Sequence, residues 1–122
     1  PRVVADGEPF RAALEHGVAE AFDLILTTGG TGHTPQDVTP EMTQTVIERE
    51  SPGLAEAVRS YGVSVGIPTA ILSRGVAGIA GSTLVVNLPG SPGGCRDGIA
   101  VLGPVLPHAL DQIHGGDHTR SP

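Results

Sequence analysis

Short apolar runs of strand length alternate along the chain with segments whose apolar residues recur at helical spacing. Phe10, Leu14 and Val18 lie four residues apart and predict an amphipathic helix over 9–21. The apolar runs are short and bounded by glycine, proline or polar residues, which is typical of strands buried in a sheet. They predict four strands, at 2–5, 23–28, 68–73 and 83–87.

Prolines and their neighbours mark where the other helices begin. Thr39 is expected to be an N-cap, with Pro40 at the first helical position. Proline also interrupts helices, so the last helix is expected to bend near Pro104 and Pro107. These signals predict three helices, over about 39–50, 52–61 and 92–113, with a loop at 62–66.

The order of strands and helices predicts an α/β fold: a three-layer α/β/α domain on a mostly parallel, mixed central sheet. The 122 residues, of which 39% are hydrophobic, suffice for one modest core. We therefore predict a single domain over 1–114 and a flexible tail over 115–122, where no side chain suits a core.

Charge and composition exclude several ligand classes. The net charge is -6 and aromatic residues make up 2%, whereas nucleic-acid binding needs a basic face or stacking platforms. All 7 basic residues are arginines, which excludes a Gly-Lys-Ser/Thr phosphate loop. Mean hydropathy near zero gives no reason to expect a membrane span. The single cysteine, Cys95, and the lack of a secretory signal favour a cytoplasmic location.

A glycine-rich turn follows the predicted strand at 23–28. It has the sequence Thr-Thr-Gly-Gly-Thr-Gly at 27–32, and Asp37 comes shortly after it. A strand that ends in glycines before a helix presents backbone amides to an anion. A carboxylate beside such amides suits Mg²⁺, which proteins hold with one or two carboxylates and substrate phosphates. The pairing predicts phosphoryl or nucleotidyl chemistry.

A second turn of the same kind follows the predicted strand at 83–87. It has the sequence Leu-Pro-Gly-Ser-Pro-Gly-Gly at 88–94. The predicted strand at 68–73 ends at Ser73 and Arg74, whose hydroxyl and guanidinium are natural phosphate partners. We expect these strand ends to converge on one anionic ligand.

Each candidate residue also has a purely structural interpretation. Asp37 suits a turn before the helix at 39, and Asp6 suits a turn or a helix cap. Ser73 and Arg74 suit a surface ion pair, and the glycines suit positive φ angles. Cys95 lies near a helix start, where we expect a buried small side chain without a catalytic role.

Taken together, the motifs resemble those of the MogA/MoaB family of molybdopterin-binding proteins. They occur in the family's order, as Thr-Gly-Gly-Thr-Gly at 28–32, Asp-Val-Thr-Pro-Glu at 37–41, Ser-Arg-Gly at 73–75 and Asn-Leu-Pro-Gly-Ser-Pro-Gly at 87–93. The resemblance covers the chain nearly to its tail. It implies a further strand and helix before Arg2, with that strand between those at 2–5 and 23–28, so we expect the natural protein to begin upstream of Pro1.

The resemblance implies an enzyme of molybdenum cofactor biosynthesis that transfers AMP from Mg-ATP to the phosphate of molybdopterin. Asp37 and Asp6 match aspartates of the family that bind Mg²⁺ and act in catalysis. The family also implies a homotrimer that works with other molybdenum cofactor assembly proteins. The substrate-binding residues expected from these motifs are Thr28, Gly29, Gly30, Thr31, Gly32, Ser73, Arg74, Asn87, Pro89, Gly90, Ser91 and Gly93.

Other functions stay open at this point. A non-catalytic molybdopterin carrier of the MoaB type would keep the glycine turns without needing both aspartates. A molybdenum-insertion domain of the MoeA type shares the glycine and aspartate pattern but belongs to a protein with further domains. A CinA-like hydrolase is more remote, because its loop should depart from Thr-Gly-Gly-Thr-Gly.

Overall fold

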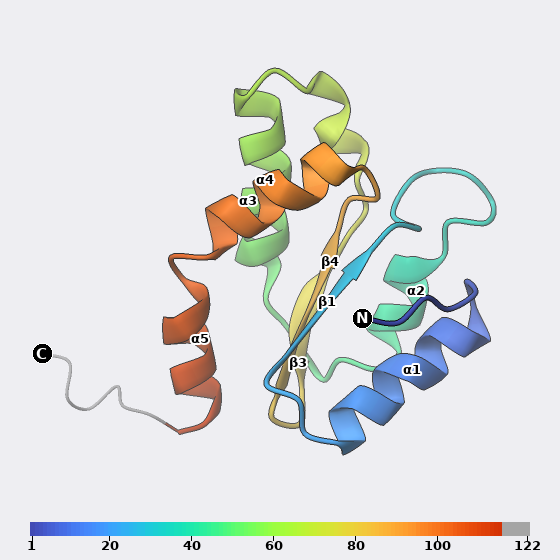
Figure 1. The fold of residues 1–122 in the computed structure, drawn as a ribbon, viewed down its shortest axis with the longest axis vertical. Coiled ribbons are helices and arrows are strands. Elements are labelled where there is room, and N and C mark those ends of the chain that lie inside the picture. The colour runs from blue at the N-terminus through green and yellow to red at the C-terminus, as the bar shows by residue number, and fades with distance from the viewer. Residues whose placement is uncertain (116–122) are drawn as a thin grey trace, which may run out of the picture.

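The computed structural model describes residues 1–115 and has a central sheet between two sets of helices (Figure 1). No helix in this described part is long and apolar enough to cross a membrane. In chain order the elements are α1 (Glu8–Ala19), β1 (Leu24–Thr28), α2 (Thr39–Gln44), β2 (Arg49–Glu50), α3 (Pro52–Ser64), the 3-10 helix η1 (Pro68–Leu72), β3 (Ala77–Ala80), β4 (Thr83–Leu88), α4 (Pro92–Leu102) and α5 (Leu106–Ile113).

The sheet has the strand order β1-β4-β3-β2. β1 and β4 are parallel, with Thr28 opposite Leu88, whereas β3 is antiparallel to both β4 and β2. Because β1 and β4 run in the same direction, their carboxyl ends lie together at one end of the sheet. The two glycine turns that follow these strands are therefore neighbours.

β3 and β4 form a hairpin whose turn lies at the opposite end of the sheet. Ala80 pairs with Thr83, which leaves Gly81 and Ser82 in the turn, and Gly81 has a φ of 59°. Since β3 is antiparallel to β4, the chain that leads into β3 arrives at the end where β1 and β4 finish. Segment 73–76 therefore lies beside the glycine turns.

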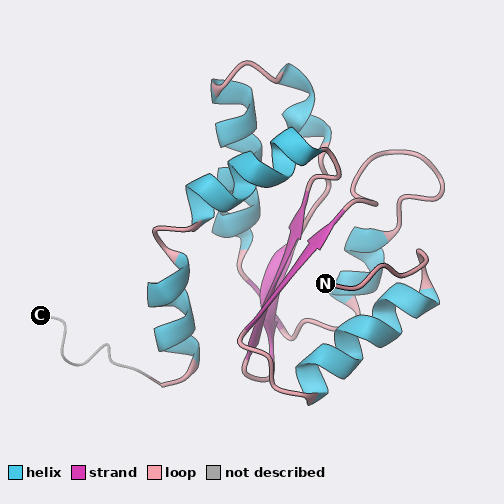
Figure 2. Ribbon diagram, in the orientation of Figure 1, coloured by secondary structure: helices cyan, strands magenta, loops and turns pink. Residues whose placement is uncertain are grey.

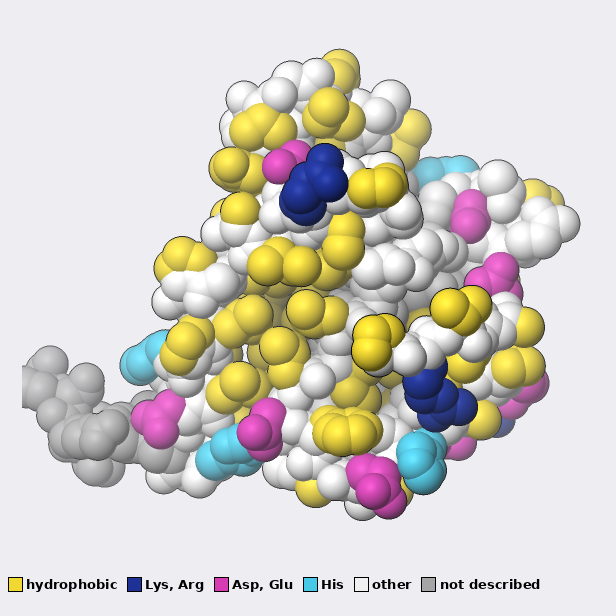
Figure 3. Space-filling view, in the orientation of Figure 1, with side chains coloured by type: hydrophobic (Ala, Val, Ile, Leu, Met, Phe, Trp, Pro, Cys, Tyr) yellow, Lys and Arg dark blue, Asp and Glu magenta, His cyan; other side chains and the backbone are white. Residues whose placement is uncertain are grey.

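Helices cover both faces of the sheet, which confirms the predicted three-layer α/β fold. α1 and α2 lie on one face, and α3, α4 and α5 lie on the other (Figures 1 and 2). β4 is buried along its whole length, and its Leu84, Val86 and Leu88 join Val58 and Leu102 in the core. β1 is the edge strand and leaves Leu26 37% exposed. Hydrophobic side chains gather on the face of the molecule that Figure 3 shows.

Two of the predicted strands are wrong. Residues 2–5 form no strand, and Val3 is fully exposed, so its apolar side chain has no sheet neighbour. Residues 68–72 form η1, because Pro68 favours a helical start and Ile71, at 67% exposed, is not buried in a sheet. The sheet uses β3 instead. The prediction missed β3 because its Gly78 packs against the backbone of Arg49, where a side chain would not fit.

The helix boundaries also differ from the predicted ones. α2 ends at Gln44, and its N-cap is Val38 rather than Thr39, whose amide instead donates to the Gly30 carbonyl. α3 continues through Gly62, which packs closely against Ala70. The predicted helix over 92–113 is divided into α4 and α5, with Pro104 between them and Pro107 in the first turn of α5. Of the predicted tail, residues 116–122 lie outside the described residues.

Candidate functional site

Two adjoining cavities open where β1 and β4 end. The first, which we call the loop cavity, has a volume of about 430 Å³ and lies between the two glycine turns and segment 69–73. The second, the helix cavity, has a volume of about 250 Å³ and lies between α3, η1 and the start of α4. The two cavities share four lining residues, Thr69, Ser73, Pro89 and Ser91.

Most of the predicted substrate-binding residues line these cavities. The loop cavity is bordered by Gly29, Gly30, Thr31, Gly32, Asp37, Ser73, Pro89, Gly90 and Ser91. Gly93 borders the helix cavity. The predicted residues that border neither cavity are Thr28, Arg74, Asn87 and Asp6.

The first glycine turn needs its glycines for conformation and for space. Gly29 and Gly30 have φ angles of 91° and 68°, in the region that side chains disfavour. A Cβ on Gly30 would also collide with the Thr39 side chain. The turn therefore passes close to α2 and leaves its backbone exposed to the cavity.

Asp37 borders the loop cavity with an oriented carboxylate. Its Oδ2 accepts hydrogen bonds from the Thr34 amide at 3.0 Å and from the Thr34 hydroxyl at 2.9 Å. These two bonds hold the pKa of the Asp37 carboxyl below its usual value, so the group is ionised at neutral pH. A Cβ on Gly32 would lie 2.8 Å from Oδ2, so a side chain at this position would displace the carboxylate. A structural role of Asp37 in this turn is compatible with a role as a ligand, because the hydrogen bonds of the turn orient its carboxylate.

The Arg74 side chain bonds to protein atoms. Its Nε donates to the Gly32 carbonyl at 2.8 Å and its Nη2 to the Asp37 carbonyl at 2.6 Å. Its Nη1 forms an ion pair with Glu41 at 2.7 Å, and this hydrogen bond lowers the pKa of the Glu41 carboxyl. The sequence left a surface ion pair open as a purely structural role for Arg74. The structure shows such an ion pair, and its partner Glu41 lies on α2.

Asn87 is buried, with 3% of its surface exposed, and its amide bonds within the fold. Its Oδ1 accepts from the Val76 amide at 3.0 Å, and its Nδ2 donates to the hydroxyls of Thr27 and Thr43. Asn87 thus ties together β1, α2 and the segment before β3. A substrate contact by Asn87 stays a prediction.

Ser91 is the N-cap of α4 and borders both cavities. Its Oγ accepts from the Gly94 amide at 3.0 Å, which satisfies one of the free donors at the helix start. The Ser91 hydroxyl proton remains available to a ligand. The sequence predicted the ligand role of Ser91 but not its cap.

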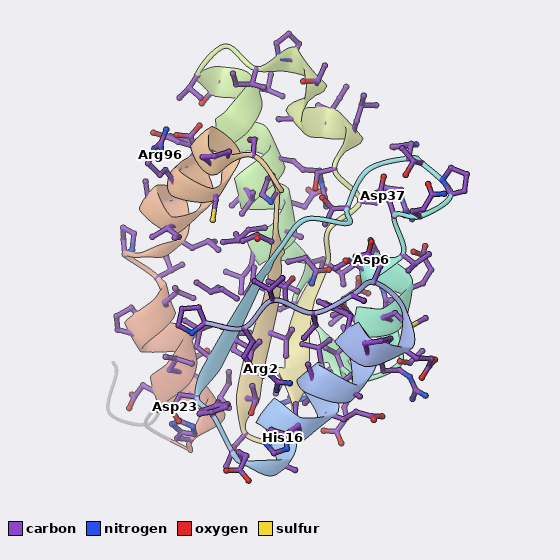
Figure 4. All side chains as sticks on the ribbon, turned by 45° about the vertical axis from the view of Figure 1, so that its right-hand side comes forward. Arg2, Asp6, His16, Asp23, Asp37 and Arg96 are labelled. Carbon is purple, nitrogen blue, oxygen red and sulfur yellow. The ribbon has the colours of Figure 1, made fainter. Side chains whose placement is uncertain are left out.

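Asp6 lies on the exposed segment before α1, on the same side of the molecule as Asp37 (Figure 4). Within residues 1–115 there is no cluster of three His, Cys, Asp or Glu side chains that would hold a metal unaided. One ionised carboxylate, Asp37, beside a glycine-lined cavity does fit Mg²⁺ shared with substrate phosphates. The part of Asp6 in such a site stays a prediction.

Some cavity residues escaped the sequence interpretation. Thr69 borders both cavities, but it was assigned to a strand that does not form. Arg59 borders the helix cavity and donates to the carbonyls of Ser73 and Gly75 at 3.1 Å and 2.9 Å. Asp97 borders it from α4. Nothing in the spacing of Arg59 or Asp97 distinguishes them from ordinary helix surface residues.

Comparison with known proteins establishes the family. The sequence matches the family described as "Probable molybdopterin binding domain" over residues 1–108. The chain belongs to this molybdopterin-binding domain family. The molybdopterin adenylyltransferase of Helicobacter pylori is 43% identical over 93 residues, which cover 76% of this chain and 52% of that protein. The chain therefore spans about half the length of this family member.

Solved structures of the family superpose closely on the chain. The Mog protein of Mycobacterium ulcerans matches with a TM-score of 0.91 and 56% identity, covering 94% of this chain and 74% of that one. The molybdopterin biosynthesis enzyme MoaB of Thermus thermophilus matches with a TM-score of 0.80 and 50% identity, covering 87% and 67%. These matches confirm the MogA/MoaB resemblance and the fold, and they place the chain among proteins of molybdenum cofactor biosynthesis.

Proposed function

We propose that this chain is the catalytic domain of a molybdopterin adenylyltransferase. A phosphate oxygen of molybdopterin attacks the α-phosphorus of ATP, the bond to the β-phosphate breaks, and adenylyl-molybdopterin and pyrophosphate leave. The observation that carries the proposal is the ionised Asp37 carboxylate at the edge of a cavity lined by glycine backbone. The adenylyltransferase name of the Helicobacter pylori relative supports it.

The loop cavity suits the reacting phosphates. The amides of both glycine turns and the Ser91 hydroxyl would donate hydrogen bonds to phosphate oxygens, because each borders the cavity. Asp37 would hold Mg²⁺, with Asp6 as its proposed second carboxylate. When bound, Mg²⁺ neutralises charge that develops on the transferred group.

The two cavities offer room for two substrates. They meet at Thr69, Ser73, Pro89 and Ser91, so ligands in both would approach each other there. No covalent nucleophile is needed, since the substrate phosphate attacks, and Cys95 borders neither cavity. The chain's contribution would be alignment of the two phosphates and stabilisation of charge.

A non-catalytic molybdopterin carrier is the second candidate. The observation that favours it is the position of Asp6, which borders neither cavity, so one of the two expected carboxylates is not placed at the site. Both candidates predict molybdopterin binding at the glycine turns, and they differ in turnover. A homotrimer with other cofactor assembly proteins as partners belongs to the proposal on the family resemblance alone, and a cytoplasmic location belongs to it on the single cysteine.

One assay separates the two candidates. The protein is incubated with molybdopterin, ATP and Mg²⁺, and the products are separated, identified and quantified by mass spectrometry. The enzyme is expected to give adenylyl-molybdopterin and pyrophosphate in equal amounts, and none without Mg²⁺. Tight molybdopterin binding with no adenylylated product would establish the carrier. Light scattering of the same sample measures the oligomeric state.

A further inference from the structure

Arg74 holds the loop at 31–41 at its beginning, middle and end. Its backbone amide donates to the Thr31 carbonyl at 2.8 Å, and its Nε donates to the next carbonyl, that of Gly32. Its Nη2 reaches the Asp37 carbonyl, and its guanidinium pairs with Glu41 in the first turn of α2. One residue from the segment before β3 thus contacts this connection at Thr31, Gly32 and Asp37 and also the first turn of α2.

The Asp37 carboxylate depends on this loop for its position. The two hydrogen bonds to its Oδ2 come from Thr34, which lies in the same loop. They fix the carboxylate relative to the loop but do not fix the loop relative to the sheet. The Asp37 peptide is attached to the segment before β3 by the bond from Arg74 Nη2 at 2.6 Å.

The backbone on either side of Arg74 is fixed by hydrogen bonds from α3. Arg59 on α3 donates to the carbonyls on both sides of Arg74, those of Ser73 and Gly75. α3 packs against β3, β4 and α4, so the support reaches the core. The connection runs from α3 through segment 73–75 to the loop that carries Asp37.

We infer that Arg74 and Glu41 are positioning residues for the proposed adenylyl transfer: they fix the loop that presents Asp37, and Arg74 does not bind substrate. The inference rests on the proposed function for its kinetic consequence. It replaces the ligand contact that the sequence suggested for Arg74 with a contact between protein elements. The planar fork of arginine suits this task, because it reaches two carbonyls and a carboxylate at once.

The test compares Arg74→Lys, Glu41→Gln and a matched control, Arg11→Lys. Arg11 pairs with Glu8 and Glu15 on α1, and its side chain is 35% exposed against 32% for Arg74. No residue of α1 borders either cavity. The measurements are kcat, the KM values for molybdopterin and Mg-ATP, the melting temperature, and hydrogen exchange of the amides of residues 31–38.

Arg74→Lys is expected to lower kcat by about 10- to 100-fold, as lost support for a catalytic ligand does, with little change in the KM for molybdopterin. Exchange of the amides of 31–38 is expected to quicken. Glu41→Gln should also lower kcat and quicken the exchange, but by smaller factors, because glutamine keeps an oxygen that can accept a hydrogen bond from Arg74. Arg11→Lys should change neither.

Two outcomes would overturn the inference, and a third separates it from the proposed function. A lower KM for either substrate in Glu41→Gln at unchanged kcat would show that Arg74, once released, binds substrate. Unchanged amide exchange in Glu41→Gln and Arg74→Lys would show that the pair does not hold the loop. A wild-type protein that makes no adenylylated product removes the kinetic role and the proposed function, whereas the exchange comparison still decides whether the pair holds the loop.

Discussion

The backbone of Gly90 lies directly against that of Gly29, so closely that a Cβ on Gly90 would come within 3.1 Å of the Gly29 Cα. The two residues lie 61 positions apart in the sequence and belong to different glycine turns. Parallel pairing of β1 with β4 brings them together. Both residues border the loop cavity, where their backbones are in contact with no side chain between them.

This contact predicts that Gly90→Ala separates the turns. The obstacle is backbone, which cannot rotate away, so we expect a loss of stability of about 1–3 kcal/mol and weaker molybdopterin binding. Gly93→Ala is the matched stability control, because a Cβ on Gly93 would meet nothing within 4 Å and the residue lies in the first turn of α4. Urea unfolding measures both variants. Equal stabilities would contradict the contact.

Asp37→Asn is predicted to keep the fold and molybdopterin binding while product formation falls by about 10²- to 10³-fold, the scale of losing one charge-stabilising group. Asparagine still accepts hydrogen bonds from Thr34 but loses the charge that Mg²⁺ needs. Asp23→Asn is the control, because Asp23 precedes β1 at the opposite end of the sheet. Normal turnover by Asp37→Asn would rule out the proposed role of Asp37.

The Ser91 variants are predicted to rank in opposite orders for stability and for binding. Aspartate is as good an N-cap as serine, so Ser91→Asp should keep the helix start, whereas Ser91→Ala should cost about 1 kcal/mol of stability. Aspartate also places a negative charge against the phosphate, so Ser91→Asp should bind molybdopterin more weakly than Ser91→Ala. Titration and thermal melts give the two orders. Equal affinities would mean that the second turn is only structural.

Acid is predicted to weaken the loop through Asp37 and Glu41. Their ordinary values are 3.8 and 4.5, and the fold lowers the pKa of both carboxyls. A lowered folded pKa contributes stability above the unfolded value, and this is lost as the pH falls through the folded value. The unfolding free energy should therefore decline below about pH 4.5, modestly because both carboxylates are near solvent. A variant with Asp37→Asn and Glu41→Gln should decline less steeply in urea titrations.

The sequence predicted the fold class and most of the lining of the loop cavity because both follow from local signals. Apolar runs located β1 and β4, and glycines after each strand located the two turns. For Arg74 the sequence could not separate a ligand contact from an ion pair, because its partner Glu41 lies 33 positions away and only the fold brings them together. β3 was missed because it consists mainly of glycine and alanine, which form a strand here through close packing with neighbouring elements. Short-range sequence patterns do not encode such packing.

The hairpin turn at Gly81 and Ser82 carries no chemistry, yet it determines how the site is assembled. It fixes the pairing of β3 with β4, and through β3 it determines where Ser73 and Arg74 stand relative to the glycine turns. An insertion there that shifted the pairing by one step would turn the side chains of β3 to the wrong face. The register of the hairpin thus matters to the site even though its turn lies at the end of the sheet farthest from the substrates, where composition alone would suggest a tolerant loop.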